Sequence, residues 1–300
     1  MEFKQIALSD KTLFDQYLKI NQYPHSQFNF TNIFMWGDFI NMKYALLDDF
    51  LCIGGNCKRL CNYLLYPLGK GSKKAVIEKI IDFYQGNFRF LILNDEMLRE
   101  LEQFFPGEFE VFDMRNSYDY VYNAEDLINL TGKKYHSKRN HINKFKQLYQ
   151  YEYVKLTRET LPLCKEVEEY WIAKSDMPEE EKAHERAATF KALDNFEYLG
   201  AVGGIITVEG EPVAFSLGEM MTDDMALIHL EKAKTEFEGS YTVINNEFVK
   251  HVKKLKEKKY RDICQSYIIE GIKLINEAIN ENANIKQIVI CEDCTKIDVI

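Results

Sequence analysis

Apolar residues recur at two different spacings along the chain, and the spacing predicts the type of each element. Residues 72–84 and 240–255 carry apolar side chains three or four positions apart, which predicts amphipathic helices. Ser72 is expected to cap the first of them. Short runs rich in branched and aromatic residues predict strands instead. These runs are "YALLDDFLCIGG", "NYLLYPLG", "RFLIL", "FEVFDM", "YDYVYN", "YEYVKL", "GGIITVEG", "EPVAFSLGEM" and "MALIHLEKA".

The order of the expected elements suggests two successive α/β units and a tail. Residues 1–130 form the first unit, and residues 131–255 form a second that begins with a helix. After that helix the order is one strand, two helices with a break near Pro178, three antiparallel strands and a helix. This is the order of an acyltransferase of the GNAT type, although many α+β domains share it. We therefore expect a mixed α/β fold with two tandem GNAT-like domains and a divergent tail over 256–300.

Composition limits the class of protein. The 300 residues are 46% apolar and 13% aromatic, which is enough for a packed core and too apolar for a disordered chain. No stretch approaches the roughly 20 apolar residues of a membrane span, and the N-terminus lacks the apolar region of a signal peptide. A cytoplasmic protein is expected. The seven cysteines are read as reduced thiols, and the lone "CEDC" pair lacks the further ligands of a metal site.

Positive charge is concentrated in one short stretch of an acidic chain. The formal charge is −9, which argues against DNA binding by the whole surface. Yet "GKKYHSKRNHINKFKQLY" (132–149) contains six lysines and arginines and no acid. A local basic patch of this kind is compatible with phosphate recognition.

On a helix, this basic stretch has an apolar stripe with one cation inside it. Tyr135, Ile142, Phe145 and Tyr149 fall within about 80° of arc, and Lys138 falls among them. A lysine there extends its ammonium group to solvent, pairs with an acid, or lines a cavity.

If Lys138 lines a cavity, the helix becomes a binding element. Lys138 and Arg139 would then hold a phosphate or carboxylate in a cleft between the two domains. His141, just outside the stripe, would assist proton transfer, although a surface histidine with ordinary hydrogen bonds is the alternative.

Polar residues also interrupt two strands that should be central. In "LIHLE" (227–231), His229 and Glu231 share a face, and Glu219 ends the preceding strand. Buried groups of this kind need partners and make general bases with shifted pKa values. His229 and Glu231 are therefore the candidate base and its orienting partner, with Glu219 as a weaker candidate. The alternative is a hydrogen-bonded pair with a structural role only.

Several segments together resemble a known bacterial family. "SQFNFTNIFMW", "GKKYHSKRNHINKF", "EPVAFSLGE", "IHLEKA" and "GSYTVINNEF" occur in an order and spacing similar to those of the C-terminal catalytic domain of phosphatidylglycerol lysyltransferase. The resemblance covers roughly residues 10–250. It implies two GNAT-like domains in tandem, as in Fem-type aminoacyltransferases, and transfer of an aminoacyl group from a tRNA ester to an amine or hydroxyl.

The expected donor site departs from the acyl-CoA pattern. GNAT enzymes bind the pyrophosphate of coenzyme A at a glycine-rich turn that begins a helix. "EFEGSYTVI" (236–244) stands there, with Gly239 and with Ser240 as a cap, but without the basic residue and second glycine. Glu236 and Glu238 would repel a pyrophosphate. This favours aminoacyl-tRNA over acyl-CoA, or a domain without catalysis, and Tyr241 would line the donor or acceptor pocket.

The tail resembles a different class of protein. Residues 253–293 are similar to the N-terminal substrate-binding segment of knotted, SPOUT-type RNA 2′-O-methyltransferases. The S-adenosylmethionine domain would follow, but the chain ends at Ile300, so methyltransferase activity is not expected. The basic start of this segment either contacts RNA phosphate or is a solvated helix end.

These observations lead to two classes of function. The first is an acyl- or aminoacyl-transferase-like enzyme that acts on a lipid or amine acceptor. The second is a non-catalytic module that binds tRNA or anionic lipid headgroups, or RNA through its tail. Neither the donor, the acceptor nor the oligomeric state follows from the sequence.

Overall fold

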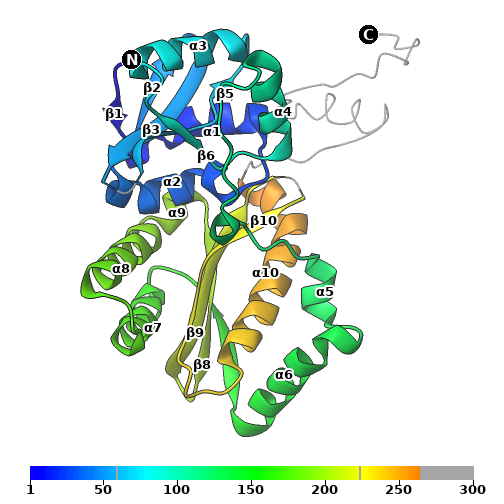
Figure 1. Ribbon diagram of the computed structural model, residues 1–300. Helices are drawn as coiled ribbons and strands as arrows, with labels where there is room; N and C mark the ends of the chain where they lie inside the picture. Colours follow the sequence, from blue (N-terminus) through cyan, green and yellow to red (C-terminus); the bar gives the residue numbers. More distant parts are fainter. Residues whose placement is uncertain (59, 223, 264–300) are drawn as a thin grey trace, which may run out of the picture. The chain divides into compact units, whose positions relative to one another are not determined.

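The computed structural model describes residues 1–58, 60–222 and 224–263, with the side chains of 255–263 left out (Figure 1). Residues Met1–Val252 form one compact unit, and Lys253–Ile300 form a second. The mixed α/β fold expected from the sequence is confirmed, because the first unit contains two β-sheets together with helices. Each sheet lies within one of the two predicted domain ranges. The boundary at residue 130 itself stays a prediction.

The first sheet has six strands in the order β1-β2-β3-β4-β6, with β5 paired to β3. All its pairings are antiparallel except β4 with β6. Its strands are β1 (Lys4–Gln5), β2 (Met42–Leu47), β3 (Phe50–Cys57), β4 (Cys61–Leu65), β5 (Leu68–Gly69) and β6 (Arg89–Leu91).

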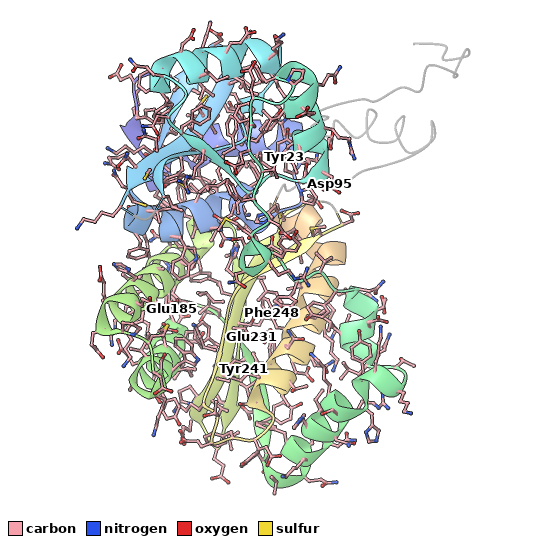
Figure 2. All side chains as sticks on the ribbon, viewed as in Figure 1. Tyr23, Asp95, Glu185, Glu231, Tyr241 and Phe248 are labelled. Atoms are coloured by element: carbon pink, nitrogen blue, oxygen red, sulfur yellow. The ribbon has the colours of Figure 1, made fainter. Side chains whose placement is uncertain are left out.

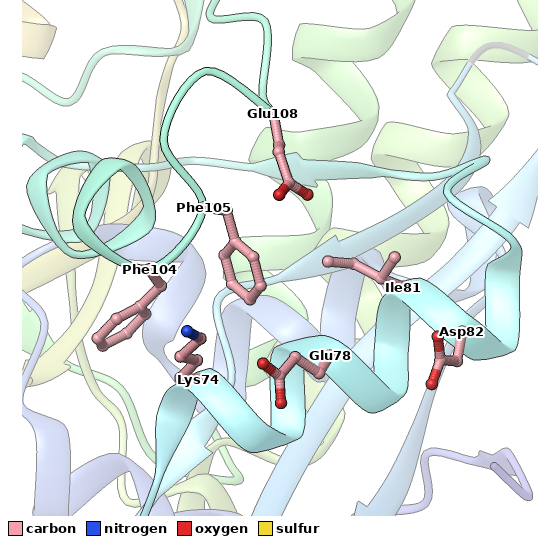
Figure 3. Close-up of a pocket in the computed structure, with 7 residues that line it drawn as sticks. All are labelled: Lys74, Glu78, Ile81, Asp82, Phe104, Phe105 and Glu108. Carbon is pink, nitrogen blue, oxygen red and sulfur yellow. The ribbon is translucent and has the colours of Figure 1, made fainter.

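Helices α1 (Lys11–Asn21), α2 (Phe30–Trp36), α3 (Lys73–Tyr84) and α4 (Asp95–Phe104) accompany the first sheet (Figure 1). The predicted cap of α3 is confirmed, since the amide of Ala75 donates to Ser72 Oγ at 3.2 Å. Phe14 of α1 and Phe30 of α2 meet edge to face in the core, with ring centroids 5.2 Å apart. A surface hollow of about 270 Å³ lies between α3 and the end of α4 (Figure 3). None of the predicted site residues lines it.

One prediction in this half is wrong. The runs "FEVFDM" and "YDYVYN" were expected as strands, but the described segment between α4 and α5 (Ala124–Asn129) contains no strand. Several of its apolar side chains, such as Phe112 and Tyr120, are exposed, although Phe109 packs against the hydrophobic cluster of the first half. The segment is tied down by Asp119, which accepts hydrogen bonds from the amide and hydroxyl of Ser26 at 2.8 and 2.9 Å. Alternation alone does not make a strand where no neighbouring strand offers a ladder.

The second sheet has four strands in the order β10-β9-β8-β7, all antiparallel. They are β7 (Tyr151–Lys155), β8 (Val202–Val208), β9 (Glu211–Met220) and β10 (Ala226–Ala233). Helices α7 (Leu161–Lys174) and α8 (Glu179–Asp194) cover one face, with the short α9 (Phe196–Leu199) after them. Helices α5, α6 (His136–Leu148) and α10 (Ser240–Ile263) accompany the other (Figure 1).

The second sheet separates two hydrophobic clusters, one on each of its faces. Ile205 packs with α7 and α8 in a cluster that continues through Phe14 and Phe30 of the first half, whereas Ile206 packs with α6 and α10. The period-2 alternation of a strand puts these neighbours on opposite faces. The predicted apolar stripe of the basic helix is confirmed, since Ile142 and Phe145 are buried against the second cluster.

Candidate functional site

Strand β10 is an edge strand among the strands that the structure describes, and polar side chains gather along it. Its residues alternate between two helical layers. Glu231 reaches α10, where Asn245 Nδ2 donates to Glu231 Oε2 at 2.9 Å. Lys232 points the other way and donates to Glu185 Oε1 of α8 at 2.6 Å. Figure 2 labels Glu231 and Tyr241 near α10 and Glu185 on the opposite side.

Glu231 is a carboxylate whose pKa differs from the ordinary value. Burial raises the pKa of its carboxyl, and the hydrogen bond from Asn245 and the positive charge of Lys138 oppose that rise only in part. The Asn245 amide occupies one carboxylate oxygen, Oε2. A raised pKa makes a carboxylate a stronger proton acceptor than an ordinary exposed one.

Lys138 lies half-buried on α6, close enough to Glu231 to influence it. Within the described parts of the chain, Lys138 has no ion-pair partner at hydrogen-bond distance, in contrast to Lys134 and Lys144 of the same basic stretch. Its ammonium group is therefore free to meet an anion.

Arg139 has a different environment from Lys138. Its Nη1 donates to the carbonyl oxygens of Leu130 and, at 2.7 Å, of Gly132. These bonds fasten α6 to the turn that follows α5. The predicted anion-binding role of Arg139 stays a prediction, and part of its donor capacity is already used.

Tyr241 and Trp171 belong to helices on opposite faces of the sheet, and their side chains come together beside β10. Tyr241 stands in the first turn of α10, and Trp171 belongs to α7. Burial raises the pKa of the Tyr241 hydroxyl, against hydrogen bonds from Trp171 and from the main chain of Ala233. A pocket of about 160 Å³ adjoins this contact and is lined by Tyr170, Trp171, Lys174, Ser175, Ala233 and Thr235.

The turn before α10 is closed by the protein itself. Gly239 has φ +94°, and a Cβ there would lie 2.8 Å from the carbonyl oxygen of His141, so α6 packs directly on the turn. Ser240 is buried, and its hydroxyl donates to the carbonyl of Lys234 at 3.0 Å. The hydroxyl is thus used away from the amides that it was expected to cap.

The acids of this turn also have partners within the protein. Lys144 Nζ donates to Glu238 Oε2 at 2.5 Å, and the hydroxyl of Tyr170 donates to Glu236 Oε2 at 2.6 Å. Neither contact brings a cation that is free to bind a pyrophosphate. Gly239 and Ser240 therefore do not form the usual cradle for coenzyme A.

His229 and Glu231 are not the pair that forms. Strand β10 has an irregularity at His229, because Ile228 pairs with Gly218 and Leu230 with the adjacent Leu217. The extra residue places His229 beside Glu219, with Nε2 to Oε1 at 2.9 Å. The shared face expected from strict alternation is lost at a bulge.

His229 has a side-chain partner at each of its two ring nitrogens. Asn32 Nδ2 donates to the carbonyl of Ser26 at 2.9 Å, which leaves Asn32 Oδ1 facing His229 Nδ1 at 2.8 Å. Burial is the largest single influence on the pKa of the Glu219 carboxyl and raises it. Hydrogen bonds and the charge of His229 together outweigh burial, so the pKa is lowered and Glu219 is ionised. Both ring nitrogens of His229 therefore lie at hydrogen-bond distance from a side-chain oxygen, one from Asn32 and one from Glu219.

Sequence reasoning missed a buried charged cluster on the α7 side of β10. Glu168 of α7 is fully buried, and neither carboxylate oxygen has a partner with hydrogen-bond geometry among the residues that the structure describes, although Thr189 lies close enough to lower its pKa. Burial raises its pKa to about 7, with Lys232 opposing the rise and Glu185 adding to it. The Lys232 ammonium lies 3.4 Å from the centre of the Trp171 ring.

A signal for Glu168 was present in the sequence. It lies four residues after Cys164 and four before Ile172, both buried, so it occupies the apolar face of its helix. An acid at such a position needs a partner or a raised pKa.

No helix in the described part of the chain is long and apolar enough to cross a lipid bilayer. The same residues contain no group of three or more histidine, cysteine, aspartate or glutamate side chains arranged to hold a metal ion.

Two solved structures are similar to this chain. A conserved protein of unknown function from Bacteroides thetaiotaomicron has a similar structure, with TM-score 0.78 and 34% identity over 84% of this chain and 86% of that one. The C-terminal domain of a putative lysylphosphatidylglycerol synthetase from Agrobacterium fabrum aligns with TM-score 0.49 and 11% identity, covering 84% of this chain and 76% of that one. A search of curated proteins finds no match.

Two family models match the sequence. The model of the MRM3-like substrate binding domain matches residues 246–298, most of which lie outside the described residues. The model described as phosphatidylglycerol lysyltransferase, C-terminal, matches residues 19–262, which is most of the chain. The protein therefore belongs to the family of the phosphatidylglycerol lysyltransferase C-terminal domain.

Proposed function

We propose that this protein transfers an aminoacyl group from aminoacyl-tRNA to a lipid headgroup or amine acceptor at the edge of β10. The observation that carries the proposal is the position of Glu231. It is a largely buried carboxylate with a raised pKa, held by Asn245 and close to a lysine without an acid partner among the described residues. Membership of the phosphatidylglycerol lysyltransferase family supports transfer chemistry of this kind.

In the proposed reaction, Glu231 acts as the general base. The acceptor hydroxyl or amine attacks the carbonyl carbon of the aminoacyl ester, and Glu231 takes the proton that the acceptor loses. The carbon–oxygen bond to the tRNA ribose breaks as the new ester or amide bond forms. The proton then passes from Glu231 to the leaving ribose oxygen, which restores the carboxylate.

Lys138 would bind the anionic partner in this scheme. A lysine ammonium recognises a phosphate as a compact point charge, so Lys138 suits either the tRNA backbone or an anionic headgroup. His141 and Arg139 would support the same site from α6. Tyr241, beside Glu231, would border the reacting groups.

The turn before α10 supports the choice of donor. Acyl-CoA requires a free cradle of amides for its pyrophosphate. Here α6 packs on Gly239, and the nearby Glu236 and Glu238 are held by Tyr170 and Lys144. Aminoacyl-tRNA needs no such cradle.

A transfer assay with the full-length protein tests the proposal. The substrates are tRNA charged with radiolabelled amino acids, and acceptors are vesicles containing phosphatidylglycerol or small primary amines. We expect label in the acceptor, and a loss of roughly 10²–10⁴-fold in Glu231→Gln. Glu152→Gln, an exposed acid on β7, is the matched control and should retain activity.

A binding module without catalysis is the second candidate. The observation that favours it is that Arg139 and the acids before α10 already have structural partners. It predicts tRNA or vesicle binding that is weakened by Lys138→Ala, not by Glu231→Gln, and no transfer with any charged tRNA. That result would overturn the transferase proposal. Binding of RNA that is lost on deletion of residues 256–300 would assign it to the tail instead.

A further inference from the structure

Two cysteines face each other at the tip of a β-hairpin in the first sheet. Cys57 is the last residue of β3, and Cys61 is the first residue of β4. The two are directly opposite in the antiparallel register. Opposed residues in such a pair have Cα atoms about 4.5–5.5 Å apart. This separation falls inside the span of about 4.4–6.8 Å that a disulfide bridges.

The neighbouring pair shows that side chains meet across this end of the hairpin. Asn56 and Asn62 are the next opposed residues, and Asn56 Nδ2 donates to Asn62 Oδ1 at 2.5 Å. Alternation puts the cysteine pair on the opposite face from the asparagine pair. This is the face of Tyr63, and Cys57 is close enough to influence the pKa of the Tyr63 hydroxyl.

Among the four cysteines that the structure describes, these two are the accessible ones. Cys61 is exposed and Cys57 is half-buried, whereas Cys52 and Cys164 are buried. Burial raises the pKa of the Cys52 thiol to about 12 and also raises that of Cys164. The reactive species is the thiolate, so both buried thiols are protected from exchange.

We propose that Cys57 and Cys61 are a redox modification site that closes to a disulfide by exchange with a small-molecule disulfide. The exposed thiolate of Cys61 attacks one sulfur of that reagent, which forms a mixed disulfide and releases one thiol. The thiolate of Cys57 then attacks the Cys61 sulfur and releases the second thiol. The two hydrogens and two electrons of the protein thiols leave with the two released thiols.

The hairpin favours the second step over capture of another reagent molecule. Only three residues separate the two cysteines, and the paired strands already hold them together, so closure costs little chain entropy. Cys61 has φ +55°, the left-handed conformation that short hairpin loops use near their end. The site is independent of the β10 edge and of the transfer reaction.

Peptide mapping of the full-length folded protein tests the inference. The protein is treated with oxidised glutathione, quenched in acid, alkylated and digested with trypsin without reduction. Trypsin cleaves after Lys58 and Arg59, so residues 44–58 and 60–70 become separate peptides that only a disulfide can hold together. We expect this linked pair as the main product and its disappearance after reduction.

Serine variants identify the linked thiols, because Cys52 lies on the same peptide as Cys57. The linkage should persist in Cys52→Ser and vanish in Cys57→Ser and Cys61→Ser. Each of the last two variants should instead accumulate a stable glutathione adduct on the remaining cysteine. Adducts on both cysteines of one wild-type molecule, a linkage that survives Cys57→Ser, or no reaction until the protein is denatured would each overturn the proposal.

Discussion

The Nε2 atom of His229 donates to Oε1 of Glu219 at 2.9 Å, and the histidine side chain has no exposed surface. Its Nδ1 faces Asn32 of α2, so the ion pair joins the second sheet to a helix of the first half. Three of the segments that carry the family resemblance, residues 26–36, 211–219 and 228–233, therefore meet at one buried polar junction. We interpret the junction as structural, and the reacting groups as lying at Glu231.

Removal of the Glu219 charge should destabilise the protein. Glu219→Gln removes the carboxylate that pairs with the buried ring of His229, and loss of one partner of such a buried pair costs about 3–5 kcal/mol. Urea denaturation at pH 7 measures the change. Glu238→Gln breaks the half-exposed pair with Lys144 and is the control, with little expected effect. Equal effects of the two variants would contradict a buried ion pair.

The same carboxylate determines a pH dependence. The pKa of Glu219 is lowered in the folded protein, so its contribution to stability is present above the ordinary carboxyl value of 4.5 and is lost as pH falls through the lowered value. The stability of the wild-type protein should therefore decline in acid more steeply than that of Glu219→Gln. Parallel declines in the two proteins would be inconsistent with this assignment.

Glu168 should give stability the opposite dependence on pH from Glu219. Its pKa is raised from 4.5 to about 7 in the folded protein, so the folded state binds this proton more tightly than the unfolded chain. Stability should fall as pH rises between these values. Glu168→Gln should remove that fall and raise the unfolding free energy at pH 8 by up to about 3 kcal/mol.

Denaturation at pH 5 and pH 8 measures this difference. Glu166→Gln, on the same helix with a half-exposed side chain, is the matched control and should keep the wild-type profile. If Glu168→Gln loses stability at both pH values, then Glu168 is ionised and paired in the folded protein, contrary to this account.

The partners of Glu231 should shift the pH profile of transfer. Asn245 and Lys138 both lower the pKa of Glu231 against the effect of burial. Asn245→Ala and Lys138→Met should each raise that pKa, so that the acidic limb of kcat/KM moves to higher pH. The base must be ionised to accept a proton, which gives the sign. A reduced rate with an unmoved limb would mean that these residues act only on substrate binding.

Gly239 and Gly210 form a matched pair for the turn before α10. Both have positive φ, +94° and +85°, but only at Gly239 would a Cβ meet another atom, the carbonyl oxygen of His141. Gly210→Ala should cost about 1 kcal/mol for the backbone alone. Gly239→Ala should cost clearly more in urea denaturation, because α6 must move. Equal costs would show that α6 is not packed tightly there.

Much of the fold was predictable from local patterns. The helix over 72–84 and its Ser72 cap follow from apolar spacing and one capping side chain. The β8–β9 hairpin follows from "EGEP", where Glu209 and Gly210 take the positive φ values that such a turn requires. The strands expected over 109–123 were wrong, because strand formation depends on a partner that the sequence does not reveal.

The candidate site was predictable only in part. The sequence alone identified Lys138 in an apolar stripe and Glu231 in an apolar strand, since a charge in an apolar pattern is visible locally. That strand was expected to be central, but β10 is an edge strand of the sheet that the structure describes. Tertiary structure decided their relationships: Lys138 acts on Glu231, and His229 pairs with Glu219. The extra residue in β10 changes which side of the sheet His229 faces relative to its neighbours, and burial is the largest influence on the pKa values of Glu219 and Glu231. The side-chain pairing and the pKa values both depend on chain segments as far apart as Asn32 and His229, which are 197 residues apart and which only the folded protein brings together.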